Sequence, residues 1–292
     1  MTSNRRFQEI SGDLPINPVT IMIKKLALGI MSLGLMVVAA QAQIAGDNAG
    51  NYGGGWTNGT NGGTGFTAWD LTQNNNNGVD VHAGYFLGDS TAGGSGNINT
   101  SGNSFGVFAN QSGSTTAFAN ALRTFTEGNL TLGQTFSIQL AVNFRNGDKG
   151  LTLSNGGTEV FDFNVGPPFT NAADDYTYSV NGGGQTSLGL AYEPDSVFTL
   201  SFTQGSANNV VVKIVRATSE LGTETPLNST FQFGPINAFK LYNSGTADGG
   251  ADNNLYFNNL AITVIPEPST LVLLAGPALL GGWSFLIRRR NS

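Results

Sequence analysis

The sequence predicts an all-β fold, a single jelly-roll β-sandwich over residues 43–265 of the 292-residue chain. Apolar residues recur at every second position in many short segments, which is the period of a half-buried strand. The residues between these segments are mostly Gly, Asn, Ser and Thr, which favour turns over helix interiors. The chain contains 41 Gly in all. No convincing amphipathic helix interrupts this pattern, so the sequence favours strands throughout.

The clearest strand is predicted over residues 136–144, where apolar and polar side chains alternate. A Gly-containing turn at 146–150 leads to a second alternating segment at 151–153. The turn at 155–157, Asn-Gly-Gly, leads to a third at 160–165. We expect these three segments to form a meander of hairpins.

Further strands are predicted along the rest of the chain. They cover residues 176–180, 188–192, 198–202, 210–215, 231–233, 239–241 and 255–264. The β-branched run 210–215 is typical of a central strand. Short strands about 8–12 residues apart indicate a sandwich or barrel. A parallel β-helix ranks second, because the sequence has no fixed repeat period.

Residues 44–104 are less regular and rich in Gly and Asn, but they contain enough aromatic residues to dock on a core. We interpret them as the first strands of the sandwich, joined by long loops. Residues 117–125 fit either one helical turn or a strand, and both alternatives stay open.

Composition excludes several classes of function. The chain has no Cys, which removes disulfides, thiolate metal sites and cysteine nucleophiles. Its single histidine, His82, excludes a multi-histidine zinc site. Residues 43–265 carry six basic and 16 acidic residues, a net charge of −10, so a nucleic-acid partner is not expected.

The N-terminus has the three-part pattern of a secretory signal peptide over residues 22–42. Two lysines precede an apolar run of 14 residues at 26–39, and small residues precede a cleavage site between Ala42 and Gln43. We expect export through the Sec translocon. Residues 1–21 are interpreted as a mis-assigned start or a disordered extension.

The C-terminal segment 266–290 has three parts in a fixed order. They are Pro266, Glu267 and Pro268, then a predicted transmembrane helix at 269–287, then Arg288, Arg289 and Arg290. The arginines indicate the topology, because the side of a membrane helix that carries Lys or Arg stays in the cytoplasm. The two prolines hold the motif extended. Everything before the motif is therefore expected outside the inner membrane.

Segment 266–290 resembles the PEP-CTERM sorting signal, in which Pro-Glu-Pro, a hydrophobic helix and an Arg-rich end follow one another. The resemblance implies a Gram-negative bacterium that makes extracellular polysaccharide, and an exosortase, a membrane-embedded transpeptidase, as processing partner. The Pro-Glu-Pro residues would then be substrate positions. The resemblance also implies transient anchoring in the inner membrane before the protein reaches the cell surface or extracellular matrix.

Segment 252–263 resembles the last strand of concanavalin-like jelly rolls, the class that contains lectins and glucanases. A glycosidase of that class needs paired carboxylates. The nearest pattern is Glu193-Pro194-Asp195, but Phe198 stands where a third carboxylate would be, and Pro194 favours a turn. No catalytic residue is assigned.

Two binding sites are candidates. No cofactor is certain, but oxygen donors suited to a structural calcium ion are grouped at Asp248, Asp252, Asn253 and Asn254. Aromatic residues near polar loops that could stack on a glycan are Trp56, Trp69, Tyr85 and Tyr242. Core packing is the competing role for these rings. Alternation in its segment places His82 toward solvent.

These observations predict a non-catalytic protein of the cell surface or polysaccharide matrix, with extracellular polysaccharide as a candidate ligand. The alternative is a secreted polysaccharide-processing enzyme of the concanavalin-like class. Paired carboxylates in a groove would favour the enzyme, and exposed aromatics without them would favour the binder.

Overall fold

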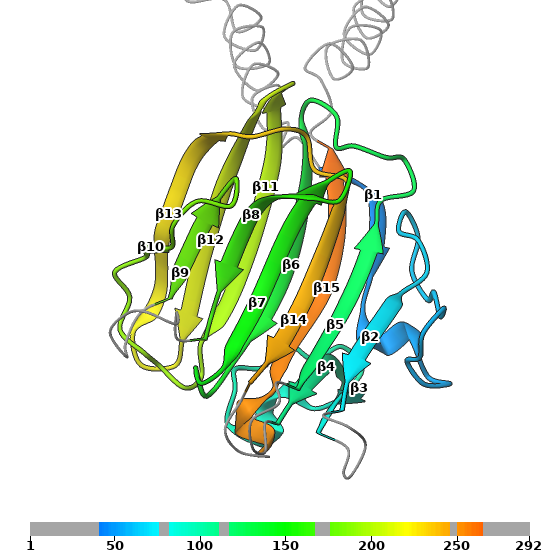
Figure 1. Ribbon diagram of the computed structural model, residues 1–292, viewed down its shortest axis with the longest axis vertical. Coiled ribbons are helices and arrows are strands. Elements are labelled where there is room, and N and C mark those ends of the chain that lie inside the picture. The colour runs from blue at the N-terminus through cyan, green and yellow to red at the C-terminus, as the bar shows by residue number, and fades with distance from the viewer. Residues whose placement is uncertain (1–40, 76–81, 111–116, 167–175, 246–249, 265–292) are drawn as a thin grey trace, which may run out of the picture. The chain divides into compact units, whose positions relative to one another are not determined.

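The protein folds into two antiparallel β-sheets that pack face to face (Figure 1). The structure is a computed structural model that describes residues 41–75, 82–110, 117–166, 176–245 and 250–264. These ranges belong to one compact unit, Gln41–Ile265. The predicted all-β sandwich is confirmed.

The first sheet has eight strands in the described residues. Its order is β13 (Gly222–Gln232), β12 (Asn209–Thr218), β11 (Val197–Ser206), β6 (Gln134–Ala141), β15 (Leu255–Val264), β4 (Ser104–Ala109) and β3 (Ala83–Gly88), with β1 (Ala42–Asp47) also paired to β15. Strand β15 contacts β6 on one side and both β1 and β4 on the other, so it ties the chain's first described strand to the sheet.

The second sheet has seven strands in the described residues. Its order is β10 (Thr186–Ser187), β9 (Thr177–Val180), β8 (Thr158–Asn164), β7 (Asp148–Asn155), β14 (Ala238–Ser244), β5 (Phe118–Thr124) and β2 (Asp70–Asn74). Short 3₁₀ turns lie at η1 (Ala49–Asn51), η3 (Ser90–Gly93) and η4 (Ala251–Asn253). Every strand pair is antiparallel, which rules out the parallel β-helix for this part of the chain.

Alternation located most strands but not their partners. The run 210–215 lies in β12, between β11 and β13, as expected of an interior strand. The expected meander of 136–144, 151–153 and 160–165 is wrong. Only β7 and β8 form a hairpin, whereas β6 pairs with β11 and β15 in the opposite sheet. The β6–β7 connection crosses between sheets, and the period of two is the same for a hairpin and a crossover.

The open alternative at residues 117–125 resolves as strand β5. It lies between β14 and β2, with Ala119 and Ala121 facing the core. Residues 44–104 supply β1, β2 and β3 with long connections, as the sequence indicated.

The core is unusually aromatic and contains an ion pair. Trp69 packs edge-on against Trp56, with ring centroids 5.3 Å apart. The Arg123 guanidinium lies 4.6 Å from the Trp69 ring centroid and forms a buried salt bridge with Asp47. Tyr52 donates to Asp47 at 2.6 Å. Because aromatic side chains bury large areas, this cluster fixes β1 and the first long loop against β5.

Several sequence predictions fall outside the described residues. These are the extension 1–21, most of the signal peptide 22–42, the Pro-Glu-Pro motif, the helix 269–287 and the terminal arginines. Within the residues that are described, no helix has both the length and the apolar character needed to cross a bilayer. Ala42 and Gln43 lie in β1, where Ala42 pairs with Val264.

Candidate functional site

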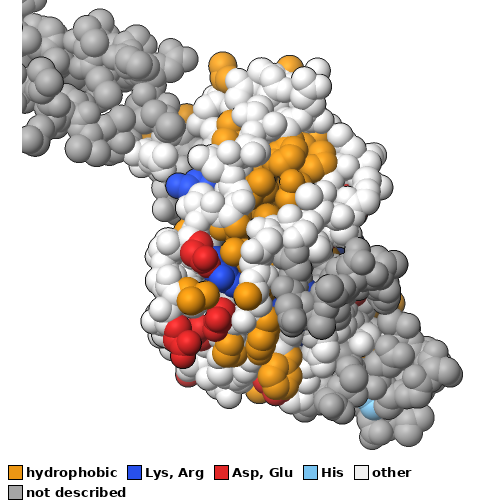
Figure 2. Space-filling view, turned by 90° about the vertical axis from the view of Figure 1, so that its left-hand side faces the viewer, with side chains coloured by type: hydrophobic (Ala, Val, Ile, Leu, Met, Phe, Trp, Pro, Cys, Tyr) orange, Lys and Arg blue, Asp and Glu red, His pale blue; other side chains and the backbone are white. Residues whose placement is uncertain are grey.

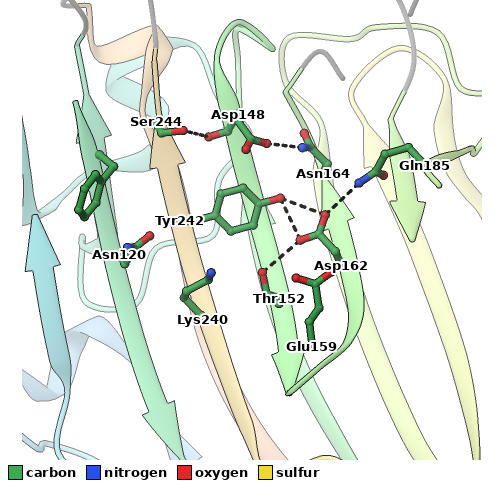
Figure 3. A pocket seen from close by; sticks show the side chains of 11 residues that line it. Asn120, Asp148, Thr152, Glu159, Asp162, Asn164, Gln185, Lys240, Tyr242 and Ser244 are labelled. Atoms are coloured by element: carbon green, nitrogen blue, oxygen red, sulfur yellow. Dashed lines mark hydrogen bonds between the residues drawn. The ribbon is translucent and has the colours of Figure 1, made fainter. Parts of the chain in front are cut away.

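A groove lies on the outer face of the seven-stranded sheet, across β5, β14, β7 and β8 (Figure 3). Its cavity is about 480 Å³, within the size range of small-molecule sites. Side chains that line it come from four neighbouring strands and the loop before β10. They are Phe118, Asn120, Asp148, Thr152, Glu159, Asp162, Asn164, Gln185, Lys240, Tyr242 and Ser244.

Strand register places these side chains in two rows. Tyr242 lies opposite Asn120 of β5 and Gly150 of β7, and Gly150 lies opposite Asn164 of β8. In the adjacent row, Lys240 lies opposite Thr152, which lies opposite Asp162. Alternate residues of the same strands, such as Leu151, Phe163 and Leu241, are buried in the core. The period of two therefore separates the groove from the core.

Gly150 makes room for the central side chain of the groove. A Cβ atom there would lie 2.0 Å from the Phe163 carbonyl oxygen and 2.9 Å from the Tyr242 hydroxyl. Without it, the Tyr242 side chain crosses β7 and its hydroxyl reaches Asp162 on β8 (Figure 3).

Asp162 is held by three neutral donors. The hydroxyl of Tyr242 lies 3.0 Å and 3.2 Å from its two carboxylate oxygens. Thr152 Oγ1 donates to Oδ1 at 3.1 Å, and Gln185 Nε2 donates to Oδ2 at 3.3 Å. Both Asp162 and Thr152 are buried although they point away from the core. The carboxyl group is therefore fixed in position and shielded from water.

Burial raises the pKa of Asp162 to about 6. The hydrogen bond from Tyr242 lowers it, the charge of Glu159 raises it, and the bonds from Gln185 and Thr152 lower it. Burial, together with the charges of Asp162 and Asp148, raises the pKa of the Tyr242 phenol well above its usual value. A phenol in this state is a hydrogen-bond donor rather than a base, so Tyr242 orients Asp162.

A β-bulge brings a second carboxylate to the same face. The register between β7 and β8 shifts after Leu153, so that Ser154 pairs with Glu159 while Thr152 pairs with Asp162. Glu159 and Asp162 are three residues apart, yet both face the groove because Val160 is the extra residue. Glu159 is exposed. The groove thus pairs a buried carboxyl group with an exposed one.

Asp148 supplies a third carboxylate at the other end of the groove. It accepts a hydrogen bond from Asn164 Nδ2. Burial raises its pKa, which the Asn164 bond and the charge of Lys240 lower. The Lys240 ammonium lies 5.6 Å from the centroid of the Tyr242 ring.

The four aromatic rings expected to stack on glycans lie in different environments in the structure. Trp56 and Trp69 are buried in the core, so these two expectations are corrected: both rings fill space between the sheets. Tyr85 is partly buried against the same core. Tyr242 lies in the groove, where its ring and hydroxyl are both close to polar neighbours.

Of the residues that line the groove, only Tyr242 was a candidate binding residue from the sequence. Phe118, a half-buried ring at its edge, lies in the segment that could be either helix or strand. Thr152 and Asp162 were available from the alternation, since they occupy polar positions between core residues of the 155–157 hairpin, whereas Asp148 was assigned to the turn at 146–150 and instead begins β7. That these residues lie close to Tyr242 could not be predicted from the sequence, because β14 follows β7 by more than eighty residues.

The calcium prediction stays a prediction. Asp248 lies outside the described residues, and no group of three or more His, Asp or Glu suited to a metal occurs in the part that is described. Asp252 and Asn253 form part of η4, and Asn254 follows it. The ammonium of Lys149 donates to the Asn253 carbonyl oxygen at 2.8 Å, which places a positive charge inside this segment.

Glu193-Pro194-Asp195 forms a turn, as the proline indicated. The Ser196 amide donates to the Glu193 carbonyl oxygen at 3.3 Å, and Asp195 accepts from the Ser219 amide at 2.7 Å. His82 precedes β3, is half-buried, and does not line the groove.

No protein-family model matches the sequence, and a search of curated proteins finds no match. Among solved structures, the chain is similar to an endo-β-1,4-glucuronan lyase from the fungus Trichoderma reesei (TM-score 0.38, 8% identity, 66% of this chain and 94% of that one). It is similar to a β-glucanase catalytic domain from Podospora anserina (TM-score 0.36, 12% identity, 61% and 78%). A toad ovary galectin in complex with thio-digalactose also matches (TM-score 0.31, 11% identity, 46% and 92%).

The expectation of a protein without catalytic activity is contradicted by these comparisons. A polysaccharide lyase, a β-glucanase and a glycosyl hydrolase family protein from Mycobacterium fortuitum are among the similar structures. Sugar-binding proteins and polysaccharide-processing enzymes thus both occur among the structures that resemble this chain.

Proposed function

We propose that the protein is a secreted polysaccharide-processing enzyme with a concanavalin-like jelly-roll fold, and that it cleaves glycosidic bonds in the groove of the seven-stranded sheet. One observation carries the proposal: the buried Asp162 and the exposed Glu159 face the same groove from one bulged strand. Hydrolysis of a glycosidic bond needs such a pair, with one carboxyl group protonated and the other able to accept a proton.

Asp162 is the proton donor in this reaction. As the bond between the anomeric carbon and the glycosidic oxygen breaks, Asp162 transfers its proton to that oxygen. A water molecule attacks the anomeric carbon and gives a proton to Glu159, so the net reaction is hydrolysis. The raised pKa of Asp162 keeps part of the population protonated near neutral pH, as a general acid requires.

The other groove residues position the sugar. Tyr242 fixes the carboxyl group of Asp162, and Asn120 and Asn164 offer amides beside it. Phe118 offers a partly exposed aromatic face at the edge of the groove. Such a mixture of convergent polar groups and one apolar surface is typical of ligand sites.

The sorting proposal places this activity outside the inner membrane. Export through the Sec translocon, cleavage after Ala42, and exosortase processing at Pro-Glu-Pro would deliver the domain to the cell surface or extracellular matrix. Masses of the two ends of the mature protein test this part.

The activity is tested by release of reducing ends from a panel of neutral, acidic and amine-bearing polysaccharides. We expect turnover by the wild-type protein and a loss of about 10²–10⁴-fold in kcat for Asp162→Asn and for Glu159→Gln. Glu220→Gln, an exposed carboxylate outside the groove, is the matched control and should keep full activity. Full activity in the Asp162 variant, or no turnover of any polymer by the wild type, would overturn the proposal.

A further inference from the structure

Most basic side chains of the folded domain are buried. Residues 43–265 contain six basic side chains, and four of them are buried: Arg123, Arg145, Lys149 and Arg216. Arg123 pairs with Asp47, and Arg216 Nε donates to Glu224 at 2.9 Å. Lys149 donates to the carbonyl oxygens of Phe144 and Asn253 at 2.9 and 2.8 Å. These four side chains are held in the interior and are not available to a ligand.

Two ammonium groups remain near the surface, and they are far apart in the fold. Lys213 is exposed on β12 of the eight-stranded sheet, and Lys240 is partly exposed on β14 of the seven-stranded sheet. The edge of the sandwich seen in Figure 2 carries groups of acidic side chains beside a small basic area. Binding a polyanion requires clustered Lys or Arg, which the described surface does not provide.

The groove itself is a concentrated acidic site. Asp148, Glu159 and Asp162 line it, and Lys240 is its single basic residue. The hydrogen-bond partners of Asp162 are all neutral, namely Tyr242, Thr152 and Gln185. Asp148 is likewise held by the neutral amide of Asn164. With Asp148 and Glu159 ionised and Asp162 holding the proton that the reaction needs, the groove still carries more negative charge than Lys240 neutralises.

We propose that the substrate of the groove is a polysaccharide with free amino groups, such as a polymer of unacetylated hexosamine. This inference rests on the proposed function and names the substrate class of that same site. An ammonium group at each sugar adds counter-charge for Asp148 and Glu159, which Lys240 alone does not balance, and the acidic surface attracts such a chain before it docks. A neutral polymer would gain neither the charge pairing in the groove nor the long-range attraction to the acidic surface. A uronate or sulfated polymer would be repelled, because it carries the same negative charge as the groove.

The test compares initial rates on four polymers: fully deacetylated glucosamine polymer, its N-acetylated counterpart, a neutral β-glucan and a polyuronate. We expect kcat/KM to be at least about tenfold higher on the amine polymer. The preference should shrink as salt is added, because salt screens charge pairs that are partly exposed to solvent. Equal rates on the amine and neutral polymers, or preference for the polyuronate, would overturn the inference while leaving glycosidic cleavage in place. No turnover of any polymer would instead overturn the proposed function as well.

A substitution locates the preference in the groove. Asp148→Asn keeps the side-chain shape and should raise KM for the amine polymer severalfold, so that the preference for the amine polymer over the neutral one falls. Glu220→Gln removes the same charge from a surface outside the groove and should leave KM unaltered. An equal rise in KM for both variants would mean that overall charge, not the groove, selects the polymer.

Discussion

The hydroxyl of Tyr242 lies 3.0 Å and 3.2 Å from the two carboxylate oxygens of Asp162, although eighty residues separate them in the chain. The contact crosses the bare backbone of Gly150 on the intervening strand. It links β14 to β8 on the outer face of the sheet. The protonation state and the direction of the Asp162 carboxyl group therefore depend on a residue from a distant part of the sequence.

Tyr242→Phe should move the pH profile of the reaction upward. The Tyr242 hydrogen bond stabilises the ionised form of Asp162, so its loss raises the pKa above about 6. Activity needs protonated Asp162 and falls as pH rises through that pKa, so the falling limb should shift to higher pH by up to about one unit. The measurement is kcat against pH for both proteins. A limb at unchanged or lower pH would refute the role given to Tyr242.

Gly150→Ala should damage both stability and activity. The new Cβ would lie 2.0 Å from a backbone oxygen that cannot move freely, and it would push Tyr242 away from Asp162. We expect a loss of about 1–3 kcal/mol in the free energy of unfolding, measured with urea, and a large fall in kcat. Gly184→Ala is the control, because its Cβ would meet nothing within 4 Å. Full activity in the Gly150 variant would exclude the packing described.

Phe118→Ala should weaken substrate binding with little effect on chemistry. The ring is half-buried at the groove edge, so sugar stacking would bury its remaining apolar surface. We expect KM to rise by up to roughly tenfold. A change of that size corresponds to the binding free energy gained when the sugar buries the part of the Phe118 ring that is still exposed. Leu122→Ala changes the same face of the same strand outside the groove and should leave KM alone. A fall in kcat alone would point to a different role for Phe118.

The alternation in the sequence was enough to predict the sandwich and most of its strands. It also separated Leu151 and Phe163, which face the core, from Thr152 and Asp162, which face the groove. It could not reveal that β6 and β7 lie in different sheets or that β14 pairs with β7. Those pairings depend on long-range packing, because the same period of two fits any partner strand.

The burial of the aromatic residues likewise could not be predicted from the local sequence. Trp56 and Trp69 lie in Gly- and Asn-rich segments that look like exposed loops, yet they are buried. The buried Arg123–Asp47 pair accommodates Trp69: Arg123 places a cation beside the ring, and Tyr52, which donates to Asp47, accepts a hydrogen bond from the indole nitrogen. Trp56 packs edge-on against Trp69. No local pattern in the sequence predicts an ion pair between residues that are 76 positions apart.

Asp47→Ala should strongly destabilise the fold, because it leaves the Arg123 guanidinium buried without its counter-charge. The expected loss is about 3–5 kcal/mol in the free energy of unfolding, measured by urea denaturation. Combining it with Arg123→Met should recover part of this loss, since the double variant buries no unpaired charge. If the double variant is as unstable as the sum of the single changes, the two residues are not coupled.

Lys149 makes stability depend on pH. Burial lowers the pKa of its ammonium to about 7 in the folded protein, from 10.5. Between these values the unfolded chain binds more protons than the folded one, so stability should rise with pH, by at most about 1.4 kcal/mol per unit. Lys149→Met should flatten this rise between about pH 7 and 10, whereas Lys213→Met, at an exposed position, should not. Equal slopes in all three proteins would contradict the lowered pKa of Lys149 in the folded state.

The most direct test is a crystal structure of Asp162→Asn with an oligosaccharide that the wild-type protein cleaves. We expect the sugar to lie along the groove of the seven-stranded sheet, with a glycosidic oxygen in hydrogen-bond contact with residue 162. The carboxylate of Glu159 should lie within reach of a water molecule beside the anomeric carbon. An oligosaccharide bound on the eight-stranded sheet, or with every anomeric carbon out of reach of both residues, would contradict it.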